Sequence, residues 1–141
     1  MKIDIFPKNP HDLYTTPLLQ QTAYWSEVKS KLGFIPLAFE IEVREKDLHP
    51  SVSSSARIRD DILILYRKIS DSEAVCYSPY GPLLSPDEEK RGDYLESLSE
   101  GLREVLPKDV ILIRFDLPWF DESEDMDIKS MEIMMNWGTV N

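Results

Sequence analysis

The sequence predicts a mixed α/β (α+β) fold, in which helices flank a sheet that contains one antiparallel hairpin. Short apolar or alternating stretches typical of strands recur along the chain, and segments with helical periodicity separate some of them. Two of these stretches, DILILYRKI and EAVCYS, are separated only by the polar SDS, which is about the spacing of a hairpin. The expected order is β α β β β α β α, and the 141 residues fit one domain, 1–141.

The first elements are a strand at 2–6, a helix, and a strand at 34–43. KIDIF and FIPLAFEIEV alternate apolar and polar residues, which is typical of half-buried strands. On one face the second strand is expected to carry Leu37, Phe39, Ile41 and Val43. Thr22 is the expected N-cap of the helix and Gly33 its stop signal. The apolar stripe of this helix consists of Trp25, Val28 and Leu32.

A long surface loop is expected at 45–60, because this Ser-rich segment has neither the helical nor the strand period. The two hairpin strands follow it. A helix start comes next, where Ser85 at the N-cap, Pro86 at N1 and Glu88 at N3 form a capping box. The apolar stripe of this helix consists of Leu95, Leu98, Leu102 and Val105, and Pro107 ends it.

The last two elements are a strand, DVILIRF, that is covered on both faces, and a helix from about Ser123. The helix would end at Gly138, and it has more apolar residues than one stripe requires: Ile128, Met131, Ile133, Met134, Met135 and Trp137. We therefore expect a second copy or a partner chain to cover 123–141. Only three residues follow Gly138, as though a further strand were beginning, so the fold is expected to be truncated.

The composition is that of a soluble globular protein. A formal net charge of −10 argues against a body that wraps nucleic acid, although a small basic pocket would not be visible at this level. No apolar stretch reaches the roughly 18 to 20 residues that a bilayer span requires, so we do not expect an integral membrane protein. Cys76 is the single cysteine, which excludes an internal disulfide and fits a reducing cytosol.

The stretch SPYGP, residues 78–82, is expected to form a stiff loop. Pro79 and Pro82 fix their φ angles, and Gly81 can adopt a positive φ. Such a loop would either border a binding groove and keep it pre-formed, or simply connect a strand to the next helix.

Four stretches in order, LLQQTAYWSEVKSKLGF, DILILYRKI, VCYSPYGPLL and ILIRFDLPW, resemble the FemAB-like peptidoglycan aminoacyltransferases over about residues 18 to 120. The resemblance implies two domains of the acyl-CoA N-acyltransferase-like (GNAT-like) fold, of which this chain would be the first. It also implies transfer of an amino acid from aminoacyl-tRNA to the stem peptide of a cell-wall precursor. The second domain, which supplies many tRNA and substrate contacts in the family, is absent, so we expect the chain alone to be inactive.

The resemblance assigns the substrate-binding residues. Trp25 and Lys29 match a W-x-x-x-K pattern whose lysine contacts the diphosphate of the nucleotide- or lipid-linked precursor. The alternative is a lysine that only packs its stem on Trp25. Tyr77, Tyr80 and Gly81 match the turn that borders the precursor-binding groove. The implied location is the cytoplasm, with peripheral attachment to the inner membrane face as an alternative.

Other chemistry has little support in the sequence. His11 and His49 lack neighbours at metal-ligand spacing, so no zinc site is expected, and no motif predicts a coenzyme. Arg114 and Asp116 interrupt an apolar strand, and an ion pair between them or with neighbouring helices is expected. No general base can be assigned. Two other functions stay open: a non-catalytic binding module of the same fold, and a small N-acyltransferase that uses a CoA thioester, although no Gly-rich pyrophosphate loop supports the latter.

Overall fold

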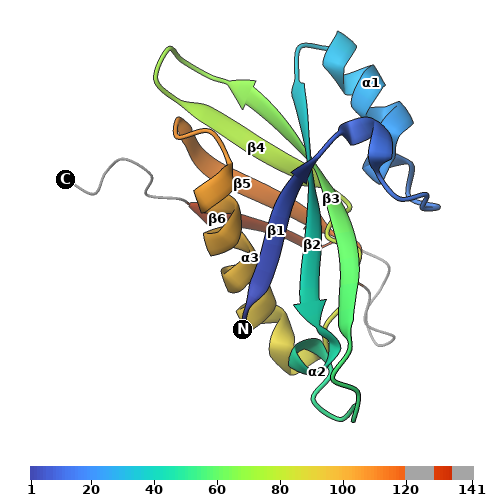
Figure 1. The fold of residues 1–141 in the computed structure, drawn as a ribbon. Helices are drawn as coiled ribbons and strands as arrows, with labels where there is room; N and C mark the ends of the chain where they lie inside the picture. The colour runs from blue at the N-terminus through green and yellow to red at the C-terminus, as the bar shows by residue number, and fades with distance from the viewer. Residues whose placement is uncertain (120–128, 135–141) are drawn as a thin grey trace.

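The computed structural model describes residues 1–119 and the backbone of 129–134, which form an α+β fold (Figure 1). Five strands within 1–119 make a mixed open sheet, and a sixth strand pairs with the last of them. The strands lie side by side in chain order: β1 (Ile3–Lys8), β2 (Ile35–Arg44), β3 (Arg57–Lys68), β4 (Ala74–Pro79), β5 (Val110–Leu117) and β6 (Lys129–Met134). The described residues also form the helices α1 (Ala23–Lys31), α2 (Glu45–Leu48) and α3 (Arg91–Val105), and the 3₁₀ turns η1 (Pro10–Asp12), η2 (Leu19–Gln21) and η3 (Glu88–Lys90).

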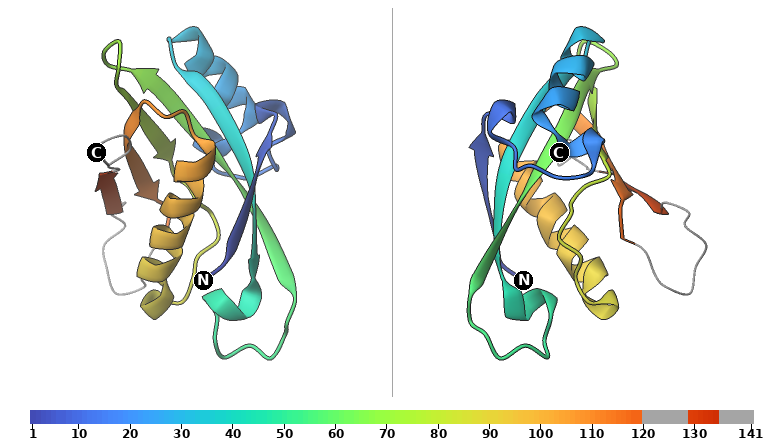
Figure 2. Two further views of the ribbon diagram at one scale, coloured as in Figure 1. Left: turned by 60° about the vertical axis from the view of Figure 1, so that its left-hand side comes forward. Right: turned by 90° about the vertical axis from the view of Figure 1, so that its right-hand side faces the viewer.

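The direction of the strands follows from their connections. Each neighbouring pair is antiparallel except β4 and β5, which are parallel. A parallel pair requires a crossover, and α3 supplies it, lying along the sheet (Figure 2). The hairpin predicted from the SDS spacing is confirmed as β3–β4. Helices α1 and α2 lie at opposite ends of β2 (Figure 1).

The hydrophobic core lies between α3 and one face of the sheet. The alternation predicted for β2 is confirmed, because Phe39, Ile41 and Val43 belong to the core and Leu37 packs against it. The helix contributes the stripe predicted for it, with Leu95, Leu98 and Leu102 buried and Val105 partly buried. The remaining core side chains come mainly from β3, β4 and β5.

The ends of α1 form as predicted. The Thr22 side chain accepts a hydrogen bond from a backbone N–H of the first turn, and Gly33 has a φ of 93°. The Phe34 N–H donates to the Lys29 carbonyl at 3.1 Å, which closes the helix in the manner of a Schellman motif. The assignment of Leu32 to the apolar stripe is wrong, because this side chain is 64% exposed. Leu32 is the C-cap residue, where the chain already leaves the helical path.

The loop predicted at 45–60 is largely wrong. Its first residues form α2, and the Leu48 side chain of this helix is fully buried in the core. Its last residues extend β3, whose pairing with β2 begins at Arg57 opposite Arg44. Burial of one leucine and the long β2–β3 ladder therefore order a segment that has no local periodicity, and only 49–56 remain as the connection.

The capping box predicted at Ser85 does not form. Ser85 is exposed, and α3 begins only at Arg91, after η3. The backbone N–H groups of Leu83 and Leu84 instead donate to the Asp60 carboxylate at 3.0 and 2.9 Å. These tertiary hydrogen bonds keep the segment extended on the sheet, and they outweigh the local preference for a helix start.

The helix predicted after Ser123 is also wrong, because residues 129–134 form β6. The backbone of β6 pairs antiparallel with β5, with Met131 opposite Phe115 and Ile133 opposite Ile113. Apolar and polar residues alternate through Ser-Met-Glu-Ile, which is the strand period. The other residues of that prediction, Ser123, Ile128, Met135, Trp137 and Gly138, lie outside the described residues. A partner for 123–141 stays a prediction, but it can no longer be argued from a helix.

Candidate functional site

The SPYGP loop leaves β4 in a conformation different from the predicted one. The positive φ, 54°, occurs at Tyr80 rather than at Gly81, and the Gly81–Pro82 peptide bond is cis. Gly81 is required for another reason: an added Cβ would lie 2.7 Å from the Gln21 Nε2 atom and 2.9 Å from the Ser78 hydroxyl. The glycine therefore permits close packing against a buried side chain.

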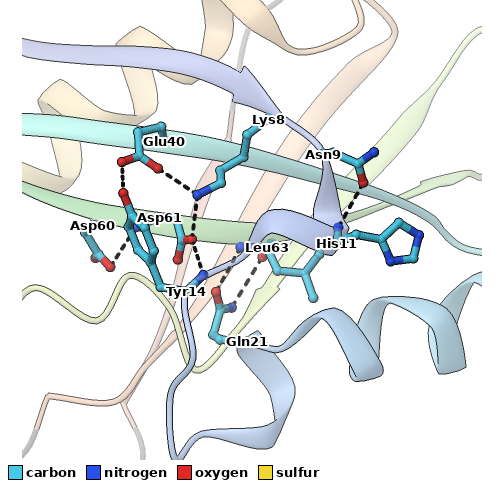
Figure 3. Close-up of polar contacts among 9 residues, drawn as sticks. All are labelled: Lys8, Asn9, His11, Tyr14, Gln21, Glu40, Asp60, Asp61 and Leu63. Carbon is cyan, nitrogen blue, oxygen red and sulfur yellow. Dashed lines mark hydrogen bonds and ion pairs between the residues drawn. The ribbon is translucent and has the colours of Figure 1, made fainter.

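Gln21 is the buried side chain against which this loop packs. Its Nε2 donates to the Pro79 carbonyl at 2.6 Å. Its Oε1 accepts from the Leu63 N–H at 2.9 Å (Figure 3). The β3–β4 ladder ends at Leu65 opposite Tyr77, so the amide of Gln21 replaces a backbone partner where the two strands diverge. Sequence reasoning missed this residue, because a glutamine in LLQQT carries no signal that distinguishes it from a surface side chain.

The far side of the loop is held by a buried carboxylate and an indole. Asp60 accepts the Leu83 and Leu84 N–H groups, and burial raises its pKa to about 6. The Trp119 indole N–H donates to the Pro82 carbonyl at 3.0 Å. The loop is thus fixed from both sides, as its proline content predicts.

A groove of about 670 Å³ opens on the sheet next to the β3–β4 hairpin. It combines three cations with aromatic and aliphatic side chains, and its lining is Phe34, Arg67, Lys68, Ile69, Val75, Cys76, Tyr77, Leu112 and Arg114. Of the predicted site residues, Tyr77 lines this groove, whereas Tyr80 and Gly81 are not among its lining residues. Tyr77 directly precedes the SPYGP loop, and the assignment of Tyr80 and Gly81 to a ligand site stays a prediction. A second cleft of similar size lies between β1 and α3 and is lined by Asp93, Glu96 and Glu100 among others.

Lys29 lies beside the groove, next to the Phe34 side chain that forms part of the groove wall. Its Nζ is 5.2 Å from the centre of the Trp25 ring and 5.4 Å from that of Phe34. The Arg67 guanidinium is 5.4 Å from the same Phe34 ring. Packing on Trp25, the alternative weighed for Lys29, is thus present, and Phe34 connects Lys29 to the groove wall. Phe34 was not predicted as a site residue, although an aromatic residue directly after the helix stop was a visible signal.

The β5 side of the groove contains the predicted ion pair. Arg114 Nε lies 3.2 Å from the Asp116 carboxylate, and the Tyr77 hydroxyl donates to the same carboxylate. Burial and this hydrogen bond raise the pKa of Tyr77, so its hydroxyl keeps its proton. The Arg114 side chain is 46% exposed, so the prediction that this strand is covered on both faces is wrong.

A second polar cluster lies on the same sheet near η1, and its groups satisfy one another. Lys8 Nζ is 2.8 Å from Glu40 and 3.0 Å from Asp61, and Asp61 also accepts the Tyr14 N–H at 2.7 Å (Figure 3). The Tyr14 hydroxyl donates to Glu40. These contacts attach the segment after β1 to the sheet, which indicates a stabilising role rather than a ligand site.

The two histidines each lie close to a carboxylate. His11 lies 3.5 Å from Glu27, and His49 Nδ1 lies 2.8 Å from Asp87. Within the described part of the chain, no group of three or more His, Cys, Asp or Glu side chains could hold a metal ion. Cys76 is buried, and burial raises its pKa to about 12, as expected of a side chain that acts as a small hydrophobe.

None of the described helices combines the length and the apolar character needed to cross a membrane. A scan against protein-family models and a search of the curated proteins found no match to this chain.

Proposed function

We propose that this chain is the precursor-binding part of a FemAB-like aminoacyltransferase, and that the groove beside Lys29 binds the anionic precursor. The observation that carries the proposal is the groove itself: Arg67, Lys68 and Arg114 line it on a chain whose formal net charge is −10. Cations gathered on an acidic body favour a small anionic ligand over a long polyanion.

The stack of Trp25, Lys29, Phe34 and Arg67 supports binding of a phosphate group. Lys29 and Arg67 both lie within 5.4 Å of the Phe34 ring centre, so two cations share one rigid support. Arg67 forms no ion pair with a described residue, and its guanidinium is therefore available to an external anion. A diphosphate between these two groups would receive charge-assisted hydrogen bonds.

The groove also suits the uncharged part of such a ligand. Tyr77 presents a ring with a hydroxyl at its tip, and Ile69, Val75 and Leu112 add aliphatic surface. A sugar or peptide portion would pack against these side chains, and the fixed β4 segment would lower the ordering cost of binding.

We also propose that the sheet is of the acyl-CoA N-acyltransferase-like type. Support comes from the element order, in which antiparallel strands β1 to β4 precede the α3 crossover to the parallel strand β5. In the proposed reaction, the amine of the stem peptide attacks the aminoacyl ester of the tRNA. An amide bond forms, the ester C–O bond breaks, and the tRNA leaves with its terminal hydroxyl. The residues described here position the acceptor, and no coenzyme takes part.

Calorimetric titration with a UDP-linked muramyl pentapeptide tests the proposal. We expect Lys29→Ala to weaken binding by about 1–3 kcal/mol, the range for losing a hydrogen bond to a charged group. Lys31→Ala is the matched control, because Lys31 lies on the same helical turn, is exposed, and lines a different, smaller pocket. Equal affinities of the wild type and Lys29→Ala would reject the site, as would equal losses in both variants.

A transfer assay with charged tRNA separates the proposal from its alternatives. We expect binding without turnover by the isolated chain, and turnover only when the aminoacyl-tRNA-binding domain is supplied. Continued absence of turnover after that addition would favour a non-catalytic binding module. Turnover with an acyl-CoA donor would favour a small N-acyltransferase.

A further inference from the structure

The three cations that line the groove differ in whether a carboxylate balances their charge. Lys68 Nζ lies 3.8 Å from the Asp109 carboxylate. Arg114 Nε lies 3.2 Å from the Asp116 carboxylate. Arg67 lines the same groove and has no carboxylate partner among the described residues. The positive charge of the groove lining that no carboxylate balances is therefore that of Arg67.

The strand register separates Arg67 from Arg114 across the sheet. Arg67 is on β3 and Arg114 is on β5, with β4 between them, and the register offsets them by two residues along the strands. Since neighbouring strands lie about 4.8 Å apart and each residue rises about 3.3 Å, the two backbone positions are about 12 Å apart. Each guanidinium also lies against its own ring, at 5.4 Å from the centre of Phe34 for Arg67 and at 5.8 Å from that of Tyr77 for Arg114. The two arginines thus form two separate positions in the groove.

Asp116 holds the side chains of the second position. The Tyr77 hydroxyl donates to one oxygen of its carboxylate, and Arg114 Nε donates to the other. Asp116 is not itself among the lining residues, and only 15% of its side chain is exposed, so it acts on a ligand through Arg114 and Tyr77. An arginine beside a carboxylate adds little net charge, but its N–H groups still donate hydrogen bonds. This position therefore suits an uncharged acceptor, such as a carbonyl or hydroxyl oxygen, better than an anion.

We propose that Asp116 is a positioning residue that sets the specificity of the groove by confining anion binding to the Arg67 end. The ligand would place its phosphate at Arg67 and its uncharged oxygens, those of amide or sugar groups, at Arg114. The inference rests on the proposed function for the identity of the ligand, and it adds the direction in which that ligand lies, from β3 to β5. Without the carboxylate of Asp116, Arg114 would offer a second anion position, and the groove would lose this direction.

Removing the charge of Asp116 should strengthen the binding of a simple anion. Calorimetric titration with inorganic pyrophosphate measures this effect, because this probe has no sugar or peptide portion. Asp116→Asn should bind pyrophosphate at least about threefold more tightly than the wild type, and its affinity should depend more strongly on salt. A merely structural role of Asp116 would weaken this binding or leave it unchanged. Arg67→Gln should bind pyrophosphate at least about tenfold more weakly than the wild type.

The double variant Arg114→Gln/Asp116→Asn removes a balanced pair of charges. Its affinity for pyrophosphate should stay within about twofold of the wild type. Its affinity for the UDP-linked muramyl pentapeptide should fall at least about threefold, because hydrogen bonds to uncharged oxygens are lost. Arg59→Gln is the matched control and should leave both affinities unchanged. Arg59 lies on the same strand as Arg67, is 66% exposed, and does not line the groove.

The pyrophosphate titrations decide the inference separately from the proposed function. The inference is overturned if the wild type does not bind pyrophosphate, if Asp116→Asn does not bind it more tightly, or if the double variant loses as much affinity for it as Arg67→Gln. Failure of the muramyl pentapeptide to bind, with the pyrophosphate results as expected, would reject the proposed function and leave the inference standing. Unchanged urea midpoints show that the variants fold, and Asp116→Ser provides the same test if Asp116→Asn is unstable.

Discussion

Gly81→Ala should destabilise the fold, although Gly81 does not have a positive φ. The new Cβ would lie 2.7 Å from Gln21 Nε2 and 2.8 Å from Gln21 Cδ, and the Gln21 side chain cannot move away because only 1% of the residue is exposed. Displacing the amide would leave the Leu63 N–H and the Pro79 carbonyl without partners. Each such buried group costs about 1–3 kcal/mol. The lower conformational entropy of the unfolded alanine variant offsets about 0.4–1 kcal/mol of this cost, so the expected net loss of unfolding free energy is about 1–5 kcal/mol.

Urea unfolding measures this loss and its cause in five proteins: the wild type, Gly81→Ala, Gln21→Ala, the double variant of these two, and Gly92→Ala. In the Gln21→Ala background the clash with Gln21 is absent and only the Ser78 hydroxyl, 2.9 Å from the added Cβ, remains too close, so Gly81→Ala should then cost less than in the wild-type background. Gly92→Ala is the control, because nothing lies within 4 Å of its added Cβ, and the alanine should stabilise α3 by up to about 1 kcal/mol. An equal loss from Gly81→Ala in both backgrounds would refute the reasoning, as would a loss below about 0.5 kcal/mol in the wild-type background.

Three further predictions concern stability. Burial raises the pKa of Asp60 to about 6, so the folded protein binds a proton on this carboxyl more tightly than the unfolded chain does. This proton binding stabilises the fold fully below pH 3.8, and the stabilisation is lost as the pH rises through 6. Urea titrations across this pH range should show the unfolding free energy of the wild type falling by up to about 3 kcal/mol relative to that of Asp60→Asn. Parallel plots of unfolding free energy against pH for the two proteins would contradict the assignment. Leu48→Ala should cost about 2–5 kcal/mol in the same assay, because the side chain is fully buried, whereas a mobile loop would lose almost nothing. Thr22→Ala should cost about 1 kcal/mol through loss of the α1 N-cap, and an unchanged urea midpoint would dispute that cap.

Local sequence patterns predicted those helices and strands in which buried side chains recur with the period of the element itself. The alternation of β2, the hairpin spacing and the two ends of α1 were all visible, because each depends on residues within a few positions of one another. Prediction failed where distant groups decide the conformation. Ser85 begins a capping box by every local rule, yet the Asp60 carboxylate holds the adjacent backbone on the sheet.

The candidate site was also predictable only where it depends on residues that are close together in the sequence. Trp25, Lys29 and Tyr77 could be selected from short motifs; of these, Tyr77 lines the groove, while Lys29 lies between the Trp25 ring and the Phe34 ring of the groove wall. Arg67 and Phe34 enter that groove through strand pairing and the turn after α1, which the sequence does not encode locally. Tyr80 and Gly81 belong to a motif whose rigidity was predicted correctly, but no short-range rule indicates which side of the loop faces a cleft.

The α3 crossover has a consequence for the order of folding. Strands β2, β3 and β4 meet through short or local connections, whereas β4 and β5 can pair only after the chain between them has closed a long loop. The contacts of Asp60 with Leu83 and Leu84 shorten that loop by fixing its first part on β3. We expect these contacts to belong to the folding transition state, so weakening them should slow refolding more than it accelerates unfolding.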